Sequence, residues 1–271
     1  MTAPEVSVVI VAWRARQEVL RCLSSLREHA GTSYEAIVVD DGSGDGTPEA
    51  VTSQFPGVNV IAKERNGGLS AGRNSALPHV RGRLVLMLDA DTLVRPDAIP
   101  RLARALDEHP HAGLVGPRLV FPDGSLQLSC RRWPPFLTPI LRRGPLARLV
   151  PEPELHRRHL MMDWDHAAER PVVYVIGAAQ MWRADLPFRI GRFDEHVSSY
   201  GGEDLDWCLR VWAAGLQVRY VPEAEFVHVF QQATRQRLFG RKSWRAFRDW
   251  YYLQWKHRRL RGAAGLVEAN G

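Results

Sequence analysis

The stretch SVVIVAW, residues 7–13, is followed by the amphipathic stretch QEVLRCLSSLREH, residues 17–29, and by a second apolar run, YEAIVVD, residues 34–40. This alternation is typical of a βαβ unit in a mostly parallel sheet. It continues with a short helical piece from Pro48, VNVIAKE (58–64), LSAGRNSALPHV (69–80) and RLVLMLD (83–89). We therefore expect an α/β fold whose mostly parallel central sheet is flanked by helices.

The bulk composition is that of a globular protein. The chain has 271 residues, of which 45% are hydrophobic, enough for one large domain or two small ones. No apolar run approaches the roughly 18–20 residues needed to cross a bilayer, and the N-terminus lacks the basic region of a secretory signal. The cysteines Cys22, Cys130 and Cys208 have neither metal-ligand spacing nor an obvious disulfide pattern. We expect a reducing, cytoplasmic location.

Polar segments, two of them rich in glycine, follow three of the predicted strands. They are DDGSGDGT (40–47), RNGGLSAGRN (65–74) and DADT (89–92). The first two could be plain turns that precede helices, since Asp, Gly and Ser are common turn residues. Ligands of parallel sheets bind at the carboxyl ends of the strands, however, and all three segments lie at that edge. Their shared position favours a binding site over three unrelated turns.

Asp89 and Asp91 in DADT form the sharpest of these candidates. Their spacing at a strand end lets both carboxylates project to the same side. Two convergent carboxylates are unfavourable unless a cation lies between them, and hard oxygen ligands favour Mg²⁺ or Mn²⁺, usually shared with substrate phosphates. An Asp-x-Asp pair alone is weak evidence, but the neighbouring loops strengthen its interpretation as a metal site.

The segment YGGEDLDWCLR, residues 200–210, has three carboxylates at the start of a predicted helix. The buried face of this helix is indicated by the spacing of Leu205, Cys208, Leu209 and Trp212. Asp206 is expected to pair with Arg210 at i, i+4 on the helix surface. Glu203 and Asp204 follow two flexible glycines, and spacing assigns them no partner. Either they only meet the positive end of the helix dipole, or one of them takes part in chemistry.

These segments, in this order and together with VPEAEFVHVF (221–230), resemble the inverting family 2 glycosyltransferases, which have the GT-A fold, a Rossmann-like α/β architecture. The resemblance covers roughly residues 5–230. It is greatest for the bacterial rhamnosyltransferase-like group, in which a stretch like PVVYVIGAAQMWRADL (171–186) precedes the Glu-Asp helix. That group builds cell-wall or surface polysaccharides.

The resemblance implies a domain organisation. A GT-A domain would cover residues 1–230, divided into a nucleotide-sugar-binding half, 1–117, and an acceptor-binding, catalytic half, 118–230. Residues 131–170 mix proline, arginine and leucine without clear periodicity, so they are either a surface insertion or a flap over the acceptor site. Residues 231–271 would form a basic, aromatic helical extension at the C-terminus.

Site residues are implied position by position. Asp204 matches the catalytic base of the Glu-Asp motif, and Asp91, with Asp89 beside it, matches the usual metal ligand. His228 matches a histidine that completes the metal or diphosphate shell, although a histidine in a strand is more often a packed core residue. The implied donor-binding residues are Ala12, Asp40, Asp41, Ser43, Asn66, Gly67, Arg73, Asp89, Ala90 and Asp91. The implied acceptor-binding residues are Gly177, Trp182, Gly202 and Glu203.

The implied reaction is a single, inverting sugar transfer. The donor would be a nucleotide-diphosphate sugar of the dTDP-rhamnose or UDP-sugar type, and the acceptor a hydroxyl of a glycan, lipid-linked or small molecule. Asp40 or Asp41 would contact the base or ribose, Arg73 would lie near the base or diphosphate, and Mg²⁺ or Mn²⁺ would stabilise the departing diphosphate. A processive synthase is disfavoured, because Gln236 replaces the tryptophan of its Gln-x-x-Arg-Trp motif.

Two other classes of function compete with this interpretation. A sugar nucleotidyltransferase also combines a Rossmann-like sheet with acidic metal ligands, but it would need a glycine-rich basic loop after the first strand. This chain has AWRARQEV (12–19) there. A nucleic-acid-binding protein would account for the basic aromatic C-terminal region but not for DADT or the Glu-Asp pair. We expect no nucleic-acid partner.

Positive charge is concentrated near the C-terminus. The chain carries 36 Lys and Arg against 30 Asp and Glu, and between residues 231 and 261 the basic residues are opposed only by Asp249. Trp244, Phe247, Tyr251 and Trp255 recur there at helical intervals. Either this helix packs its aromatic side chains on the domain, or it lies at a membrane interface, attracted to anionic lipid. The second alternative implies a peripheral location on the inner face of the cell membrane.

Overall fold

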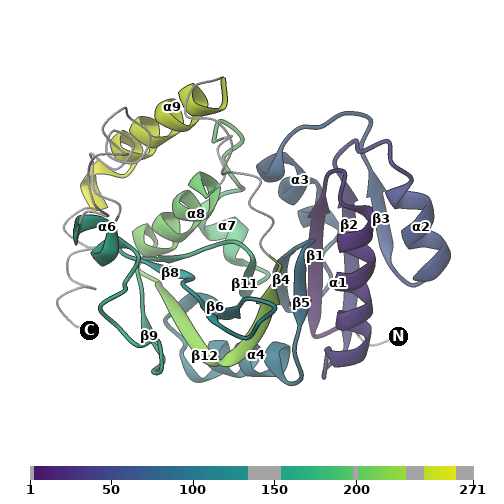
Figure 1. Ribbon diagram of the computed structural model, residues 1–271, viewed down its shortest axis with the longest axis horizontal. Coiled ribbons are helices and arrows are strands. Elements are labelled where there is room, and N and C mark those ends of the chain that lie inside the picture. The colour runs from purple at the N-terminus through teal and green to yellow at the C-terminus, as the bar shows by residue number, and fades with distance from the viewer. Residues whose placement is uncertain (1–2, 134–153, 198–200, 230–240, 261–271) are drawn as a thin grey trace.

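A single mixed sheet forms the centre of the molecule. Figure 1 shows the computed structural model, which describes residues 3–133, 154–197, 201–229 and 241–260. The main strands, in spatial order, are β3 (Asn59–Ala62), β2 (Tyr34–Asp40), β1 (Val6–Ala12), β4 (Leu84–Asp89), β11 (Ala179–Arg183), β6 (Ala112–Val120), β12 (Gln217–His228) and β5 (Thr92–Val94). Of these eight, β11 and β5 alone run antiparallel to their neighbours. The expected α/β class with a mostly parallel sheet is confirmed.

Helices cover the two faces of this sheet. In chain order they are α1 (Arg16–His29), α2 (Thr47–Gln54), α3 (Leu69–Ala76), α4 (Ala98–Glu108), α6 (Glu154–His159), α7 (Leu186–Ile190), α8 (Gly202–Ala213) and α9 (Arg241–Lys256), with 3-10 turns η1 (Leu77–His79) and η3 (Arg258–Leu260). Alternate strand residues face opposite ways. Ile10 on β1 therefore shares one core with α1 and α4, while Val9 shares the other with α8.

The first half of the chain folds as its pattern predicts. The apolar runs become β1, β2, β3 and β4, and the amphipathic segments between them become α1, α2 and α3. Val8, Val9 and Ile10 are all fully buried. Central parallel strands are covered on both faces, so such strands read as continuous apolar runs rather than as alternating ones.

The second half of the chain adds a strand on each side of β6. β11 pairs with β4 and β6, and β12 pairs with β6 on its other side. Three short strands extend this half: β7 (Leu126–Gln127) pairs with β6, β9 (Arg170–Pro171) with β12, and β8 (Cys130–Arg131) with β10 (Tyr174–Val175). β12 also pairs with β5, which brings residues 92–94 next to residues 226–228.

The C-terminal helix α9 lies over α8 (Figure 1). Leu253 is buried in the core below it, and Lys256 and His257 reach Asp206 on α8 at 2.7 and 2.8 Å. Trp255, however, is 63% exposed. Of the two alternatives for this helix, packing on the domain holds for the face that carries Leu253, whereas Trp255 lies on the exposed face.

Other expectations have mixed outcomes. The three cysteines are buried and free, as expected. Residues 134–153 of the predicted flap lie outside the described residues, while Met161 in its second part is buried in the core. Within the part of the chain that the structure describes, no helix combines the length and the apolarity needed to cross a bilayer.

Candidate active site

The sequence segments singled out for chemistry meet at the carboxyl ends of the strands. Ala12, at the end of β1, pairs with Asp40 at the end of β2, and Val11 pairs with Asp89 at the end of β4. The loops after β2 and β3 also lie close together. Gly42 (φ +72°) is so near Arg65 that a Cβ added to Gly42 would lie 2.6 Å from the backbone carbonyl carbon of Arg65. One sheet edge therefore collects the three predicted loops, as strand topology requires.

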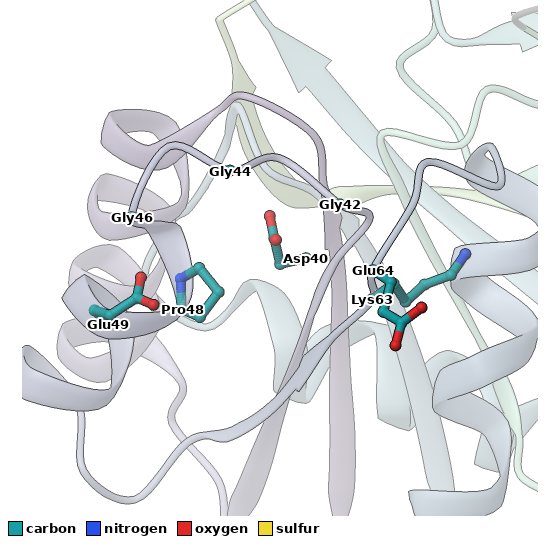
Figure 2. A pocket seen from close by; sticks show the side chains of 8 residues that line it. All are labelled: Asp40, Gly42, Gly44, Gly46, Pro48, Glu49, Lys63 and Glu64. Carbon is teal, nitrogen blue, oxygen red and sulfur yellow. The ribbon is translucent and has the colours of Figure 1, made fainter.

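A pocket of about 490 Å³ lies between the loops that follow β2 and β3. Figure 2 shows Pro48 and Glu49 on one side of Asp40, and Lys63 and Glu64 on the other. Asp40 Oδ2 accepts a hydrogen bond from Ser43 N at 3.2 Å, whereas Oδ1 is buried without a partner among the described residues. An unpartnered buried carboxylate oxygen is costly, so Asp40 is suited to accept an N–H group from a ligand.

Asp41 is the other carboxylate that was expected to contact the donor, and its oxygens form hydrogen bonds and an ion pair within the protein. Its carboxylate accepts the backbone N–H groups of Gly67 and Gly68 at 3.1 and 2.8 Å and pairs with Lys63 at 2.5 Å. It is also 2% exposed. Of the two adjacent carboxylates, Asp40 is therefore the one with capacity for the donor, while Asp41 shapes the loop that starts α3.

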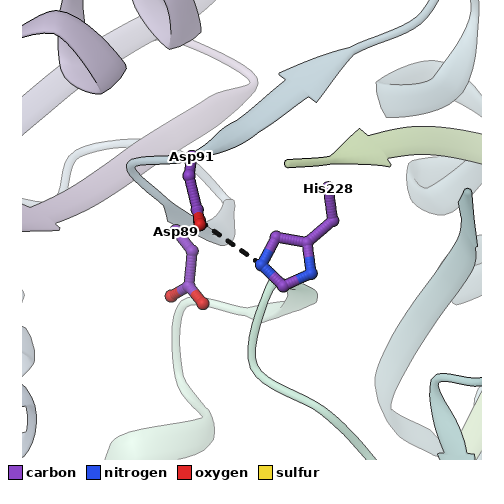
Figure 3. A group of neighbouring side chains, drawn as sticks. All are labelled: Asp89, Asp91 and His228. Atoms are coloured by element: carbon purple, nitrogen blue, oxygen red, sulfur yellow. Dashed lines mark ion pairs between the residues drawn. The ribbon is translucent and has the colours of Figure 1, made fainter. Parts of the chain in front are cut away.

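Asp89, Asp91 and His228 form the candidate metal centre. One ligand atom from each lies within 4.8 Å of the others. Figure 3 shows the carboxylate of Asp91 directed at the imidazole of His228, whose Nε2 lies 3.3 Å from Asp91 Oδ1. The pairing of β5 with β12, in which Thr92 lies opposite His228, brings the two segments together. Two carboxylates and an imidazole are donors that suit Mg²⁺ or Mn²⁺, so the residues fit the expected ion.

The pKa values of Asp89 and His228 are shifted by burial and by the charges beside them. Burial raises the pKa of Asp89 to about 6, since the attraction of Arg73 is opposed by Asp204 and Asp91. Burial lowers the pKa of His228, but the hydrogen bond and charge of Asp91 outweigh it, and the net shift is upward. The shift of His228 reflects the negative charge of Asp91 and Asp89 beside it, which a divalent cation would neutralise.

Arg73 lies between the metal-binding residues and the Glu-Asp helix. Its guanidinium is 2% exposed, donates to Asp204 Oδ1 at 2.8 Å and lies 3.7 Å from Asp89 Oδ1. Asp204 Oδ2 accepts the backbone N–H of Gly177 at 2.7 Å. A Cβ on Gly177 would collide with the Asp204 carboxylate and lie 2.6 Å from Arg73 Nη2. The glycine therefore leaves room for the ion pair and also supports it.

The three carboxylates at the start of α8 have different surroundings. Burial and the charge of Asp204 raise the pKa of Glu203, which favours its protonated form. Asp206 pairs with Arg210 at 2.8 Å as expected, but it is 1% exposed and also binds Lys256 and His257. The expectation of a surface pair is wrong, because α9 covers it. Of the three, Asp204 is the one that pairs with Arg73, at 2.8 Å, and its charge also acts on Asp89 of the candidate metal centre.

The remaining predicted residues divide into those that line the site and those that do not. Gly67 and Asn66 are exposed on the loop after β3, and Gly202 is the first residue of α8. Ala12 and Ala90 are buried at strand ends, where their side chains belong to the core. Trp182 is fully buried, and its ring centroid lies 5.3 Å from that of Trp207. The structure places the Trp182 side chain away from any acceptor surface, because it points into the core between β11 and α8.

Three residues of the site were not singled out from the sequence. Lys63 lines the pocket at the carboxyl end of β3, which is a position that strand topology alone could have flagged. Asn74 fixes the segment after α7 by exchanging hydrogen bonds with the backbone of Phe193. Gln127 accepts a hydrogen bond from His228 Nδ1 at 2.8 Å. No local pattern marks these last two, since their partners lie far away in the chain.

A mostly parallel sheet whose strand ends hold an Asp-x-Asp pair and a facing histidine is the architecture of the GT-A glycosyltransferases. The profile of glycosyl transferase family 2 matches residues 7–155, more than half of the chain, and that of glycosyl transferase family group 2 matches residues 84–267. The chain belongs to glycosyl transferase family 2. The expected family and the expected class of enzyme, a glycosyltransferase, are confirmed.

Individual relatives support the same assignment. The chain is 28% identical over 235 residues to the N-acetylglucosaminyl-diphospho-decaprenol L-rhamnosyltransferase of Mycobacterium tuberculosis, a match that covers 82% of this chain and 75% of that one. It superposes on the mannosyltransferase of Pyrobaculum calidifontis solved with GDP-Man and Mn²⁺ (TM-score 0.59, 19% identity, 100% and 75% of the chains). It also superposes on S. aureus TarS 1-349 solved with UDP-GlcNAc (TM-score 0.61, 18% identity, 92% and 64%).

Proposed function

We propose that the protein transfers one sugar, with inversion, from a nucleotide-diphosphate donor to a hydroxyl group of a glycan or lipid-linked acceptor. The observation that carries this proposal is the line formed by Asp89, Arg73 and Asp204. One buried guanidinium contacts a metal-binding carboxylate at 3.7 Å and the carboxylate of the Glu-Asp motif at 2.8 Å. A leaving diphosphate and an attacking hydroxyl could thus be held on opposite sides of one anomeric carbon.

Asp204 is the base in this proposal. The acceptor oxygen forms a bond to the anomeric carbon, the bond from that carbon to the diphosphate breaks, and the hydroxyl proton passes to Asp204. The raised pKa of the adjacent Glu203 favours its protonated form, which is suited to donate a hydrogen bond to the acceptor. Neighbouring carboxyl groups with separated pKa values are the usual way in which an enzyme divides such roles.

Asp91, Asp89 and His228 would hold a divalent cation, Mg²⁺ or Mn²⁺. When bound there, it would act as a Lewis acid on the diphosphate oxygens. The Mn²⁺ of the mannosyltransferase from Pyrobaculum calidifontis supports this proposal. Arg73 supplies a fixed positive charge beside the same carboxylates.

Asp40 favours a donor with a uracil or thymine base. Its unpartnered Oδ1 can accept the imide N–H that these two bases share, and Asp40 lines the pocket between the β2 and β3 loops. UDP- and dTDP-sugars meet this requirement. The name of the mycobacterial relative makes an activated rhamnose the first donor to test, and a diphosphate-linked polyprenol sugar the first acceptor.

A lipid-linked acceptor would bring the protein to a membrane surface, and α9 offers a suitable face. Tyr251 and Trp255 are exposed there, with the guanidinium of Arg258 4.8 Å from the Trp255 ring and Arg259 exposed beside it. Aromatic and basic side chains together bind anionic interfaces. Co-sedimentation with vesicles of anionic and of neutral lipid tests this contact. We expect Trp255→Ser with Arg259→Ser to weaken anionic binding, and unchanged partitioning would leave α9 with its packing role alone.

Asp204→Asn tests the proposed function. Thermal stabilisation by a panel of UDP- and dTDP-sugars with Mn²⁺ first identifies the donor. The variant should keep the stabilisation by that donor and lose about 10²–10⁴-fold in transfer, since the amide cannot take the hydroxyl proton. Near wild-type turnover of the variant would remove Asp204 from the role of base.

A further inference from the structure

A hydrogen-bonded chain leads from the candidate metal centre into the second half of the protein. Asp91 Oδ1 lies 3.3 Å from His228 Nε2, and the other ring nitrogen of His228, Nδ1, lies 2.8 Å from Gln127 Oε1. His228 is 6% exposed and Gln127 is 7% exposed. The amide oxygen of Gln127 thus contacts Nδ1, the ring nitrogen on the edge of the imidazole away from Asp91.

Strand pairing holds Gln127 at this position. Gln127 is the last residue of β7, the strand that returns along β6 after a turn at Gly124 (φ +83°), and it pairs with Leu119. Leu119 pairs on its other side with Phe226 of β12, two residues before His228. The side chain of Gln127 therefore reaches His228 across one strand, and regular backbone pairing fixes the register of both residues.

We propose that Gln127 is a positioning residue for the metal centre, which it serves by fixing the tautomer and the orientation of His228. This role rests on the metal site of the proposed function. An amide oxygen accepts hydrogen bonds and cannot donate them. The Nδ1 atom of His228 must therefore carry a proton, and in the neutral ring the lone pair then lies on Nε2, the atom that faces Asp91.

The alternative tautomer would not serve the site. Without the oxygen of Gln127, a proton on Nδ1 would be buried with its partner lost, which costs roughly 1–3 kcal/mol. The ring would then favour the proton on Nε2, where it would donate to Asp91 and occupy the lone pair needed for a cation. Groups that orient ligating histidines in this way commonly change metal affinity by about 10–100-fold when they are removed.

The choice of an amide rather than a carboxylate also has a consequence. Asp89 and Asp91 already place two carboxylates beside His228, with one ligand atom of each of the three residues within 4.8 Å of the others. A neutral acceptor orients the ring without adding a third charge to this cluster. Gln127 thus combines the required hydrogen-bond geometry with the least electrostatic cost.

Titration of the full-length protein with Mn²⁺ alone, followed by the electron paramagnetic resonance signal of the free ion, tests this role. Gln127→Met keeps the length of the side chain but removes the acceptor, and we expect about 10–100-fold weaker Mn²⁺ binding. Gln127→Glu restores an acceptor oxygen and should bind within about threefold of wild type, or more tightly. Gln180→Met is the matched control, because Gln180 is also buried but donates to the carbonyl of Val175.

A second readout does not depend on the metal. In the metal-free protein the Nε2–H of His228 donates to Asp91 and the Nδ1–H donates to Gln127, so ¹⁵N-histidine spectra should show hydrogen bonds at both ring nitrogens of the wild type. Gln127→Met should lose the hydrogen bond at Nδ1 and keep the one at Nε2. Wild-type Mn²⁺ affinity in Gln127→Met would overturn the role of Gln127, as would a Gln127→Glu variant as weak as Gln127→Met.

Asp91→Asn separates this inference from the proposed function. Loss of Mn²⁺ binding in Asp91→Asn but not in Gln127→Met would leave the metal site standing and remove Gln127 from it. A wild-type protein that does not bind Mn²⁺ would overturn both the metal site and the role of Gln127.

Discussion

Arg73 is a single residue on which both halves of the proposed reaction depend. Its guanidinium is fully enclosed, stacks 5.3 Å from the centroid of Phe193, and contacts Asp204 and Asp89. A buried cation is tolerated only when it is paired and hydrogen-bonded. The planar guanidinium can face two carboxylates in different directions at once, which the ammonium group of a lysine cannot do equally well.

Arg73→Lys should therefore separate rate from binding. We expect the maximal rate of transfer to fall by about 100-fold, because a displacement of the base of about 1 Å has effects of this size, while donor affinity changes by less than about threefold. Steady-state kinetics and calorimetric donor binding measure the two quantities. The control is Arg81→Lys, which alters an exposed pair with Glu35 at 2.6 Å. An equal fall in the maximal rate of transfer in Arg73→Lys and Arg81→Lys would show that Arg73 has no particular role in the reaction.

At the scale of elements, Asp41 joins the loop after β2 to the start of α3. Its carboxylate accepts backbone N–H groups at the helix N-terminus, where α3 itself has no side-chain cap. Asp45 serves α2 in a similar but purely local way, through the N–H of Thr47 at 3.0 Å. The two acids in one loop thus support different helices.

Asp41→Ala and Asp45→Ala should each lower the free energy of unfolding by about 1–2 kcal/mol, which is typical for the loss of a helix cap. Hydrogen exchange distinguishes them. Asp41→Ala should speed exchange at Gly67 and Gly68 and weaken donor binding, whereas Asp45→Ala should affect α2 only. Identical exchange patterns in the two variants would contradict the separate roles of these carboxylates.

At the scale of the whole molecule, buried charge couples α9 to α8, the helix of the Glu-Asp pair. Asp206 binds Arg210, Lys256 and His257, and Lys256 also binds Asp194 at 2.5 Å. Burial opposes ionisation of Asp206, but these partners outweigh it and lower its pKa. The contribution of Asp206 to stability is therefore complete above its ordinary pKa of about 3.9 and is lost as the pH falls through its folded value.

Asp206→Asn should lower the free energy of unfolding at pH 7 by about 3 kcal/mol, because it leaves buried cations without their carboxylate. The difference from wild type should shrink as the pH falls below about 4. Denaturant unfolding at a series of pH values measures both effects. Asp107→Asn is the control, since Asp107 also has a lowered pKa but forms an exposed pair with Arg83, and such pairs contribute about 0–1 kcal/mol. A difference for Asp206→Asn that stays constant with pH would refute the assigned ion pairs.

Much of the fold could be predicted because its signals are local. The run from Val6 to Ala12 is apolar except for Ser7, as is typical of a central parallel strand, and Asp89 stands where such a strand ends. The contact between Arg73 and Asp204 could not be predicted from spacing, since these residues are far apart in the chain and only the fold brings them together.

The directions of two tryptophan side chains have the same physical origin. Trp182 lies within the segment 171–186 that carries the family resemblance, and its side chain is fully buried, because β11 alternates its side chains between two packed faces. Trp255 has helical spacing from other aromatic residues, but periodicity gives only the existence of a face and not the direction in which it points. In both cases tertiary packing decides which side chains face water.

The pairing of β5 with β12 has a consequence for synthesis on the ribosome. Thr92 pairs with His228, and the backbone N–H of Val229 donates to the carbonyl of Asp91 at 2.9 Å. A nascent chain that has emerged only as far as β6 contains Asp89, Asp91 and the pocket beside Asp40, but not β12, the strand that carries His228. The candidate metal centre is therefore completed only after β12 has been synthesised, and a product truncated before β12 would lack its imidazole.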